Sequence, residues 1–227
     1  MLDAREYIDK CNADELDAVL DGIEYYDTKQ GIACYAVDKN IGTARILQGT
    51  RVISEGAFKG CKRLSSVEIP STVKAVSPYA FSECKGLSMC SIPEGVQKLS
   101  KYSFYKSGVK VIKIPSSLKE VGDYCFSRSE LEEIELPAIE ALGKGAFLGC
   151  ESLVLAHLSP GVKELPHGVF SGCKSLTQIS LPKGLRTIDE SAFKDCKGIE
   201  SIKLPRYVKY VAESAFSGCK VERVMRT

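Results

Sequence analysis

The sequence predicts an α/β repeat solenoid, because phenylalanine, cysteine and proline recur along the chain at one shared spacing. The chain has 227 residues and eight phenylalanines, and consecutive phenylalanines are 21 to 23 residues apart. Their positions are Phe58, Phe81, Phe104, Phe126, Phe147, Phe170, Phe193 and Phe216. A period of about 20 to 50 residues is typical of one structural unit stacked on copies of itself. We therefore expect one elongated array in which each coil contacts only its neighbours.

The interval between the sixth and seventh phenylalanines shows what each coil should contain. Ile179 and Leu181 place apolar side chains at alternate positions, which predicts a short strand. Pro182 follows, and because proline lacks a backbone N–H, it should end the strand and turn the chain. Leu185 and Ile188 then begin the return path. A small residue precedes each phenylalanine, which predicts close packing between neighbouring coils.

The combined pattern, A-F-x-G-C-x-x-L-x-x-I-x-L-P-x-x-V/L-x-x-I, resembles the BspA-like, or Treponema pallidum-type, leucine-rich repeat over roughly residues 45–227. This resemblance implies a right-handed curved solenoid, with a parallel sheet on its concave face and short strands or 3₁₀ turns on its convex face. It also implies a role in binding or adhesion and no enzymatic activity. Two units depart from the pattern, since Ser107 and Ser129 replace the cysteine and the turn there is one residue shorter.

The repeat pattern also predicts where the solenoid begins. Residues 34–227 should form about eight to nine coils, as the phenylalanine spacing indicates. Residues 34–57 should be a degenerate first coil, because their apolar residues keep the phase of the later repeats.

Residues 1–33 precede the repeats and predict a helical cap. Residues 1–30 hold nine acidic and three basic residues, a net charge of −6. Leu16, Val19 and Ile23 have helical spacing. A solenoid needs a terminal element with a polar outer face to cover its first coil, which favours the cap. The alternative is a separate acidic arm that binds a partner.

Residues 221–227 should form the last strand, with one edge open to pairing. Either the charges of Arg223 and Arg226 protect this edge, or two chains meet there, or the chain is part of a longer protein. We expect an end-to-end homodimer through this strand.

Charge and hydropathy limit the location and the class of partner. The chain has 31 Lys and Arg residues against 29 Asp and Glu residues, so its net charge is only +2. Residues 1–20 lack a basic start followed by an apolar run, and no segment approaches the length that spans a membrane. The chain as given predicts a cytoplasmic protein without membrane insertion, or a cell-surface or secreted protein if a leader has been removed.

Ten cysteines raise the question of disulfides and metals. Six share one repeat slot, three residues after the phenylalanine, at Cys61, Cys84, Cys150, Cys173, Cys196 and Cys219. We interpret this row as buried small hydrophobic side chains, in preference to disulfides between adjacent coils or a metal site. Cys11 and Cys34 lie outside the slot and are expected to be the reactive thiols. No C-x-x-C motif or His/Cys cluster is present, so we expect no metal and no cofactor.

Neither a serine or cysteine nucleophile motif nor a glycine-rich phosphate loop is present, so we predict that the protein is not an enzyme. The leading hypothesis is instead a binding module that recognises a protein or peptide on the concave face. Apolar residues stand there among charges, at positions where the strands should face solvent. The candidate residues are Met89, Lys110, Val111, Lys113, Glu132, Glu133, Glu135, Val154, Leu155 and His157.

The alternative hypothesis is adhesion to an anionic polymer or glycan along one edge of the solenoid. Five lysines follow the cysteine slot, at Lys62, Lys85, Lys174, Lys197 and Lys220. The low net charge and the lack of an aromatic row on that edge count against it.

Overall fold

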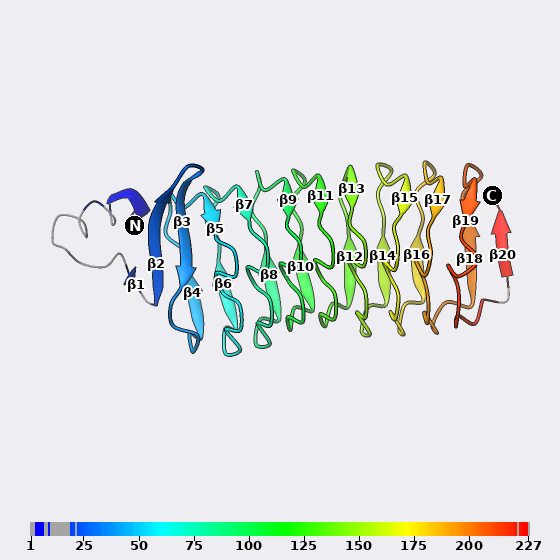
Figure 1. Ribbon diagram of the computed structural model, residues 1–227, viewed down its shortest axis with the longest axis horizontal. Helices are drawn as coiled ribbons and strands as arrows, with labels where there is room; N and C mark the ends of the chain where they lie inside the picture. The colour runs from blue at the N-terminus through cyan, green and yellow to red at the C-terminus, as the bar shows by residue number, and fades with distance from the viewer. Residues whose placement is uncertain (1–2, 7–8, 10–18, 21, 222, 227) are drawn as a thin grey trace.

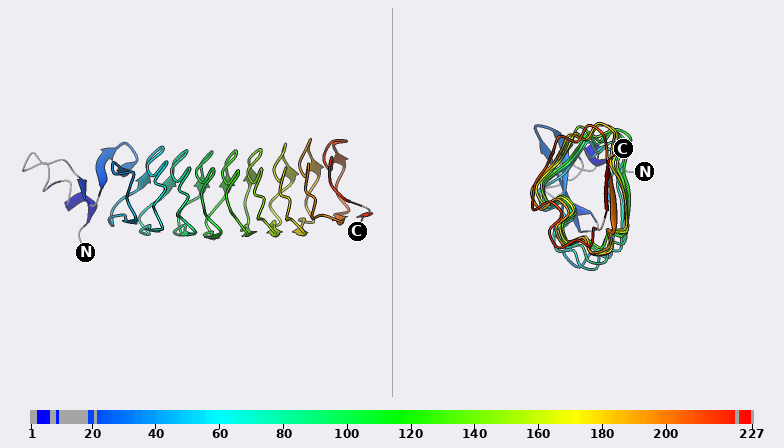
Figure 2. Two further views of the ribbon diagram at one scale, coloured as in Figure 1. Left: turned by 90° about the horizontal axis from the view of Figure 1, so that it is seen from below. Right: turned by 90° about the vertical axis from the view of Figure 1, so that its right-hand side faces the viewer.

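The computed structural model describes residues 3–6, 9, 19–20, 22–221 and 223–226, and shows coils stacked along one axis (Figure 1). Viewed along that axis, the coils superpose on one closed, flattened outline (Figure 2). The predicted repeat solenoid is therefore confirmed. Its handedness and curvature stay predictions, and so do the domain boundaries.

One side of the stack, named the front face, carries strands of three or four residues. They are β4 (Thr43–Arg45), β6 (Ser66–Glu68), β8 (Met89–Ser91), β10 (Val111–Lys113), β12 (Glu133–Glu135), β14 (Leu155–His157), β16 (Gln178–Ser180), β18 (Ser201–Leu204) and β20 (Arg223–Arg226). Parallel pairing joins β4 to β6, β8 to β10, β12 to β14 to β16, and β18 to β20. In the three-residue strands the middle side chain points inward and its two neighbours face solvent.

The opposite side, named the back face, carries two-residue strands. They are β5 (Val52–Ile53), β7 (Ala75–Val76), β9 (Lys98–Leu99), β11 (Glu120–Val121), β13 (Ala141–Leu142), β15 (Glu164–Leu165), β17 (Thr187–Ile188) and β19 (Tyr210–Val211). Parallel pairing joins β5, β7, β9, β11 and β13 in one sheet, and β15, β17 and β19 in another. The resemblance implies short strands or 3₁₀ turns on the second face, and the described residues form short strands there.

The phenylalanines form the centre of the core. Neighbouring rings are stacked with centroids 5.2 to 5.6 Å apart through all eight positions. The first seven are fully buried, and Phe216 is partly buried. The spacing of the phenylalanines in the sequence is thus the spacing of one buried column.

The cysteine slot lines this core with free thiols. Five of its six cysteines are buried, and Cys219 is half-buried. The Cys84 thiol donates to the carbonyl oxygen of Phe58 in the preceding coil at 3.0 Å, and the same contact recurs along the slot. Burial raises the pKa of Cys84 to about 12, which keeps the thiol protonated.

Cys34 does not behave as expected from its place outside the slot. It lies in β3 (Gly31–Ala36) and is fully buried, and desolvation raises the pKa of its thiol. A buried thiol of raised pKa is a poor nucleophile, so the prediction of a reactive Cys34 is wrong. Cys11 lies outside the described residues.

The helical cap predicted for residues 1–33 is not what the described residues form. Residues 4–6 and 9 are helical, but β1 (Val19–Leu20), β2 (Ile23–Thr28) and β3 make an antiparallel arrangement. The outer edge of β3 pairs in parallel with β5, so this hairpin continues the back face. The rest of the predicted helix, with Leu16, lies outside the described residues.

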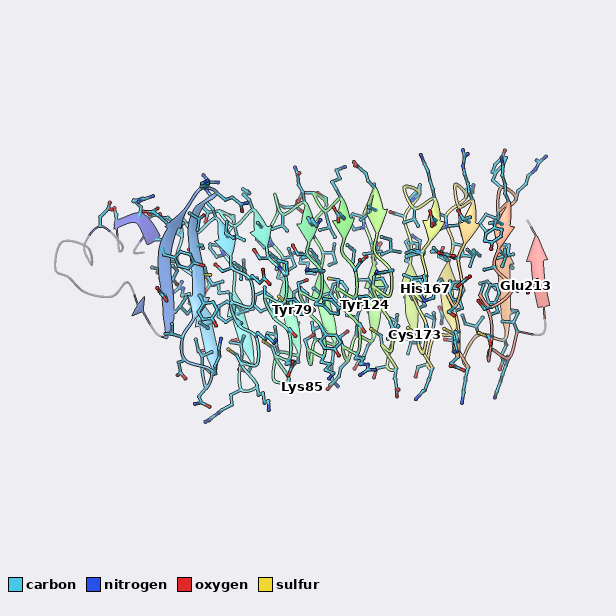
Figure 3. The ribbon with its side chains drawn as sticks, viewed as in Figure 1. Tyr79, Lys85, Tyr124, His167, Cys173 and Glu213 are labelled. Atoms are coloured by element: carbon cyan, nitrogen blue, oxygen red, sulfur yellow. The ribbon has the colours of Figure 1, made fainter. Side chains whose placement is uncertain are left out.

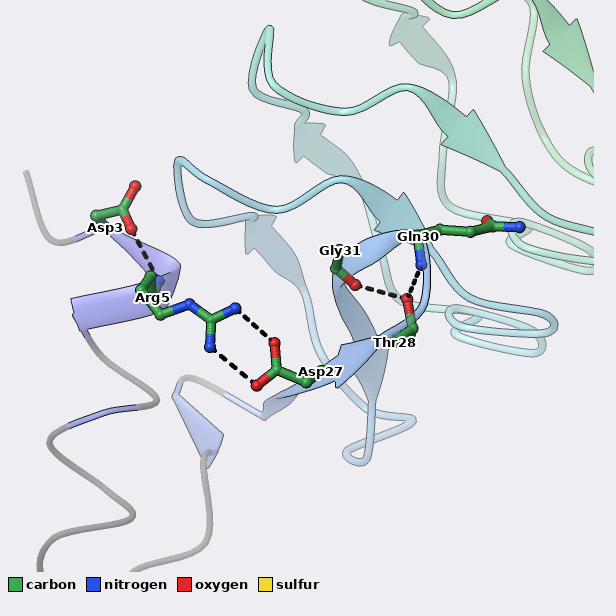
Figure 4. Close-up of polar contacts among 6 residues, drawn as sticks. All are labelled: Asp3, Arg5, Asp27, Thr28, Gln30 and Gly31. Atoms are coloured by element: carbon green, nitrogen blue, oxygen red, sulfur yellow. Dashed lines mark hydrogen bonds and ion pairs between the residues drawn. The ribbon is translucent and has the colours of Figure 1, made fainter.

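Alternation and turn chemistry explain the hairpin. Ile23 and Tyr25 are buried on one side of β2, and β-branched and aromatic residues of this kind favour strands. The turn is closed by Thr28, whose hydroxyl donates to the Gly31 carbonyl at 2.6 Å and accepts from the Gln30 N–H at 3.1 Å (Figure 4). Gly31 has φ of +108°, which other residues rarely adopt.

Arg5 is held against this hairpin by an ion pair. The Arg5 guanidinium donates two hydrogen bonds to the Asp27 carboxylate, at 2.9 and 2.7 Å (Figure 4). The Ala4 N–H donates to the Gln48 carbonyl at 2.6 Å.

In the described part of the chain, no helix is long and apolar enough to cross a bilayer.

Candidate binding surface

The candidate residues of the front face come from strands β8 to β14 and the residues just before them. The pairing of β12 with β14 sets Glu133 beside Leu155 and Glu135 beside His157. These four side chains point to the same side because they flank the inward-facing middle residues of their strands. The predicted outward positions are therefore brought together on one surface.

A hollow of about 650 Å³ lies on this surface between β10 and β12. Its walls include six of the ten candidate residues, which are Val111, Lys113, Glu133, Glu135, Leu155 and His157. Ile112, Ile114 and Pro137 add apolar lining. β10 pairs with β8, and β12 with β14, but β10 and β12 are not paired with each other. The hollow thus coincides with an interruption in the front-face ladder.

Exposed apolar side chains stand on both sides of the hollow. Met89 and Val111 are partners in the pairing of β8 with β10, and they are 66% and 40% exposed. Val154 and Leu155 are exposed on the other side. Apolar groups at neighbouring solvent-facing positions form a patch that a partner can cover.

The charged residues of the surface are only partly paired. Lys110 Nζ lies 3.4 Å from Glu132 Oε1, and both side chains are about half exposed, so this pair contributes little stability. Within the described residues, Lys113, Glu133 and Glu135 have no ion-pair partner. These unpaired charges are available to a partner. In the described chain, no group of three or more His, Cys, Asp or Glu residues is arranged to hold a metal ion.

The lysine row of the alternative hypothesis is divided. Between Lys85 and Lys174, the same slot holds Gly108, Glu130 and Glu151 in the three intervening coils. Lys174 Nζ lies 2.7 Å from Glu151 Oε1, so this lysine is paired. Figure 3 shows Lys85 at the edge of the coils. The row therefore offers two short groups of lysines and no continuous basic edge.

A column of tyrosines was not predicted from the sequence. Tyr79, Tyr102 and Tyr124 occupy one slot in consecutive coils, and their rings are stacked with centroids 5.0 and 5.1 Å apart. Figure 3 labels the first and last of them. The ammonium of Lys59 lies over one end of the stack and Gly145 packs on the other. Both outer ring faces are covered, so we read the column as structural, and the 23- and 22-residue spacing of these tyrosines was its signal.

Comparisons with known proteins agree with this geometry. The family described as a BspA type leucine-rich repeat region (6 copies) matches residues 30–154 and 122–226. A leucine-rich repeat protein of Bacteroides ovatus is 29% identical, with a TM-score of 0.81, over 89% of this chain and 57% of that longer chain. The leucine-rich repeat protein of T. pallidum is 27% identical, with a TM-score of 0.74, over 78% of this chain and 88% of that one. A search of curated proteins found no match. The family match spans most of the sequence, and the chain therefore belongs to the BspA-type leucine-rich repeat family.

Proposed function

We propose that the protein is a non-catalytic binding module that recognises a protein or peptide partner on the front face around β8 to β14, which we take to be the concave face. Leucine-rich repeat proteins generally act as binding modules, and the family membership supports that class of function. The observation that carries the location is the hollow of about 650 Å³ between β10 and β12. It joins exposed apolar residues to unpaired charges of both signs.

The chemistry of the hollow indicates what the partner should present. Apolar side chains would cover Val111 and Leu155, since burying exposed apolar surface is the main favourable term in protein association. A cationic group would meet Glu133 and Glu135, and an anionic group would meet Lys113. Such complementary charges fix orientation and speed association more than they add affinity.

Affinity capture from the native host tests this proposal when it compares matched variants. Glu133→Lys reverses a charge that lines the hollow, and Glu200→Lys reverses an exposed charge just before β18, away from it. We expect Glu133→Lys to lose a partner that the unchanged chain and Glu200→Lys both retain. Equal recovery of every partner by the two variants would contradict the proposal.

A further inference from the structure

The last coils of the back face carry a second surface, separate from the front-face hollow. Lys163, Arg186 and Lys209 directly precede β15, β17 and β19. The Arg186 N–H donates to the Lys163 carbonyl at 2.8 Å, and the Lys209 N–H donates to the Arg186 carbonyl at 2.8 Å. Three cationic residues therefore stand in one column at the strand spacing of about 4.8 Å.

These three cations form no ion pair with a described residue, whereas a lysine at the same position of an earlier coil does. In the same column, Lys119 Nζ lies 3.7 Å from Glu140 Oε1. The three later cations are exposed, and none has a carboxylate within ion-pair distance among the described residues. Lys183 and Arg206, exposed in the preceding turns, add two more positive charges nearby. Figure 3 shows long side chains tipped with nitrogen projecting outward beside β15, β17 and β19.

Two exposed tyrosines lie among these cations. Tyr207 is 61% exposed and Tyr210 is 54% exposed, and neither ring stacks on another ring in the described structure. A hollow of about 250 Å³ is lined by Tyr207, Arg186, Lys209 and Gly184. Neighbouring exposed apolar groups rimmed by polar residues are typical of an interaction site.

We propose that this basic tyrosine patch, made of Lys163, Arg186, Tyr207, Lys209 and Tyr210, binds a linear anionic polysaccharide. Sulfate or carboxylate groups on successive sugars accept charge-assisted hydrogen bonds from the cation column, and Arg186 can bind such a group with two parallel bonds. The flat C–H faces of sugar rings pack on the exposed tyrosine rings, while the tyrosine hydroxyls bond sugar hydroxyls.

The placement of the aromatic rings favours a polysaccharide over single-stranded nucleic acid. Nucleic acid is held by successive bases stacked on successive aromatic side chains. Both tyrosines belong to one coil, and the preceding coil has Gly184 and Thr187 at the equivalent positions. The exposed carboxylate of Glu164, in β15 beside Thr187, repels an anion near the Lys163 end. The binding path is therefore short and centred on Arg186 and Lys209.

Calorimetric titration of the full chain tests the patch with two probes, a heparin-derived oligosaccharide and an oligogalacturonate. We expect at least the heparin fragment to bind, with an affinity that falls as salt is raised. Binding of the heparin fragment alone identifies sulfate as the recognised group, and binding of both identifies anionic sugars in general. Arg186→Gln combined with Lys209→Gln should weaken binding by about tenfold or more, because two charge-assisted hydrogen bonds are lost.

Matched variants separate the patch from general electrostatics. Lys62→Gln combined with Lys85→Gln removes the same charge elsewhere and should change the affinity less than about twofold. Tyr207→Ala leaves every charge in place and should still weaken binding. The proposal is overturned if neither probe binds, if both double variants weaken binding equally, or if oligothymidylate binds as tightly as the heparin fragment. Circular dichroism of each variant checks that the fold is kept. The front-face proposal does not depend on whether the patch binds either probe.

Discussion

At the scale of single residues, the fold depends on equivalent side chains meeting their counterparts in the next coil. Phe126 stacks on a ring on each side, at 5.3 and 5.5 Å, and is fully buried. Among the described residues, Phe216 stacks on one ring, at 5.2 Å, and it is partly buried. The same residue type thus has different surroundings at the centre and at the end of the column.

This difference predicts unequal losses of stability. Phe126→Ala should lower the free energy of unfolding by about 3 to 5 kcal/mol, because it removes a buried ring and leaves a cavity between two others. Phe216→Ala should lower it by less, since its ring has one stacking neighbour and some exposure. Urea denaturation of both variants measures the two losses. A loss at Phe216 as large as that at Phe126 would contradict the column.

At the scale of elements, glycines in the turns differ in how closely the neighbouring coil packs on them. Gly145 follows β13 with φ of +57°, and a Cβ added there would meet the Tyr124 ring at 2.4 Å. Gly42 precedes β4, and a Cβ added there would meet nothing within 4 Å. The two glycines therefore differ in both backbone strain and available space.

Gly145→Ala should cost at least about 1 kcal/mol of unfolding free energy, because alanine disfavours positive φ and displaces the end of the tyrosine column. Gly42→Ala, the matched control, should change the free energy by less than about 0.5 kcal/mol. Thermal or urea unfolding compares them directly. If the two substitutions prove equally tolerated, the close packing of Gly145 on Tyr124 is refuted.

The coils could be predicted from the sequence because every coil repeats the same pattern of residues. An alternating strand, a proline and a buried phenylalanine recur in phase, so an ambiguous position in one coil is resolved by its equivalents. The N-terminal hairpin had no such support. Leu16, Val19 and Ile23 fit a helical spacing, while the alternation of Ile23 and Tyr25 that forms β2 spans only a few residues.

The candidate surface was predictable only in part. Strand alternation was enough to place Val111 and Glu133 outward. The hollow was not predictable, because its walls come from β10, β12 and β14, and the placement of these strands is a matter of how three coils meet. Both strands follow the turns in which Ser107 and Ser129 replace the cysteine and one residue is missing. That departure was visible in the sequence, but β6 and β8, and β16 and β18, are also unpaired, and their turns keep the cysteine.

At the scale of the whole molecule, one repeated coil presents two different surfaces. The front face combines apolar residues with charges of both signs around a hollow, whereas the last coils of the back face present cations and tyrosines. Each surface draws residues from neighbouring coils that are more than twenty positions apart in sequence. Both proposals therefore depend on the stack, and the end-to-end homodimer through β20 stays a prediction.

Pulsed electron resonance between two spin labels on the front face tests the stack most directly. One label is placed at Ser66 in β6, and the second at Val111, Leu155 or Ser201, which lead β10, β14 and β18. If the coils follow one another at about 4.8 Å, the distance should rise in equal steps to about 10, 19 and 29 Å. Distances that fail to increase from Val111 to Leu155 to Ser201 would contradict the stacked arrangement and the two surfaces built on it.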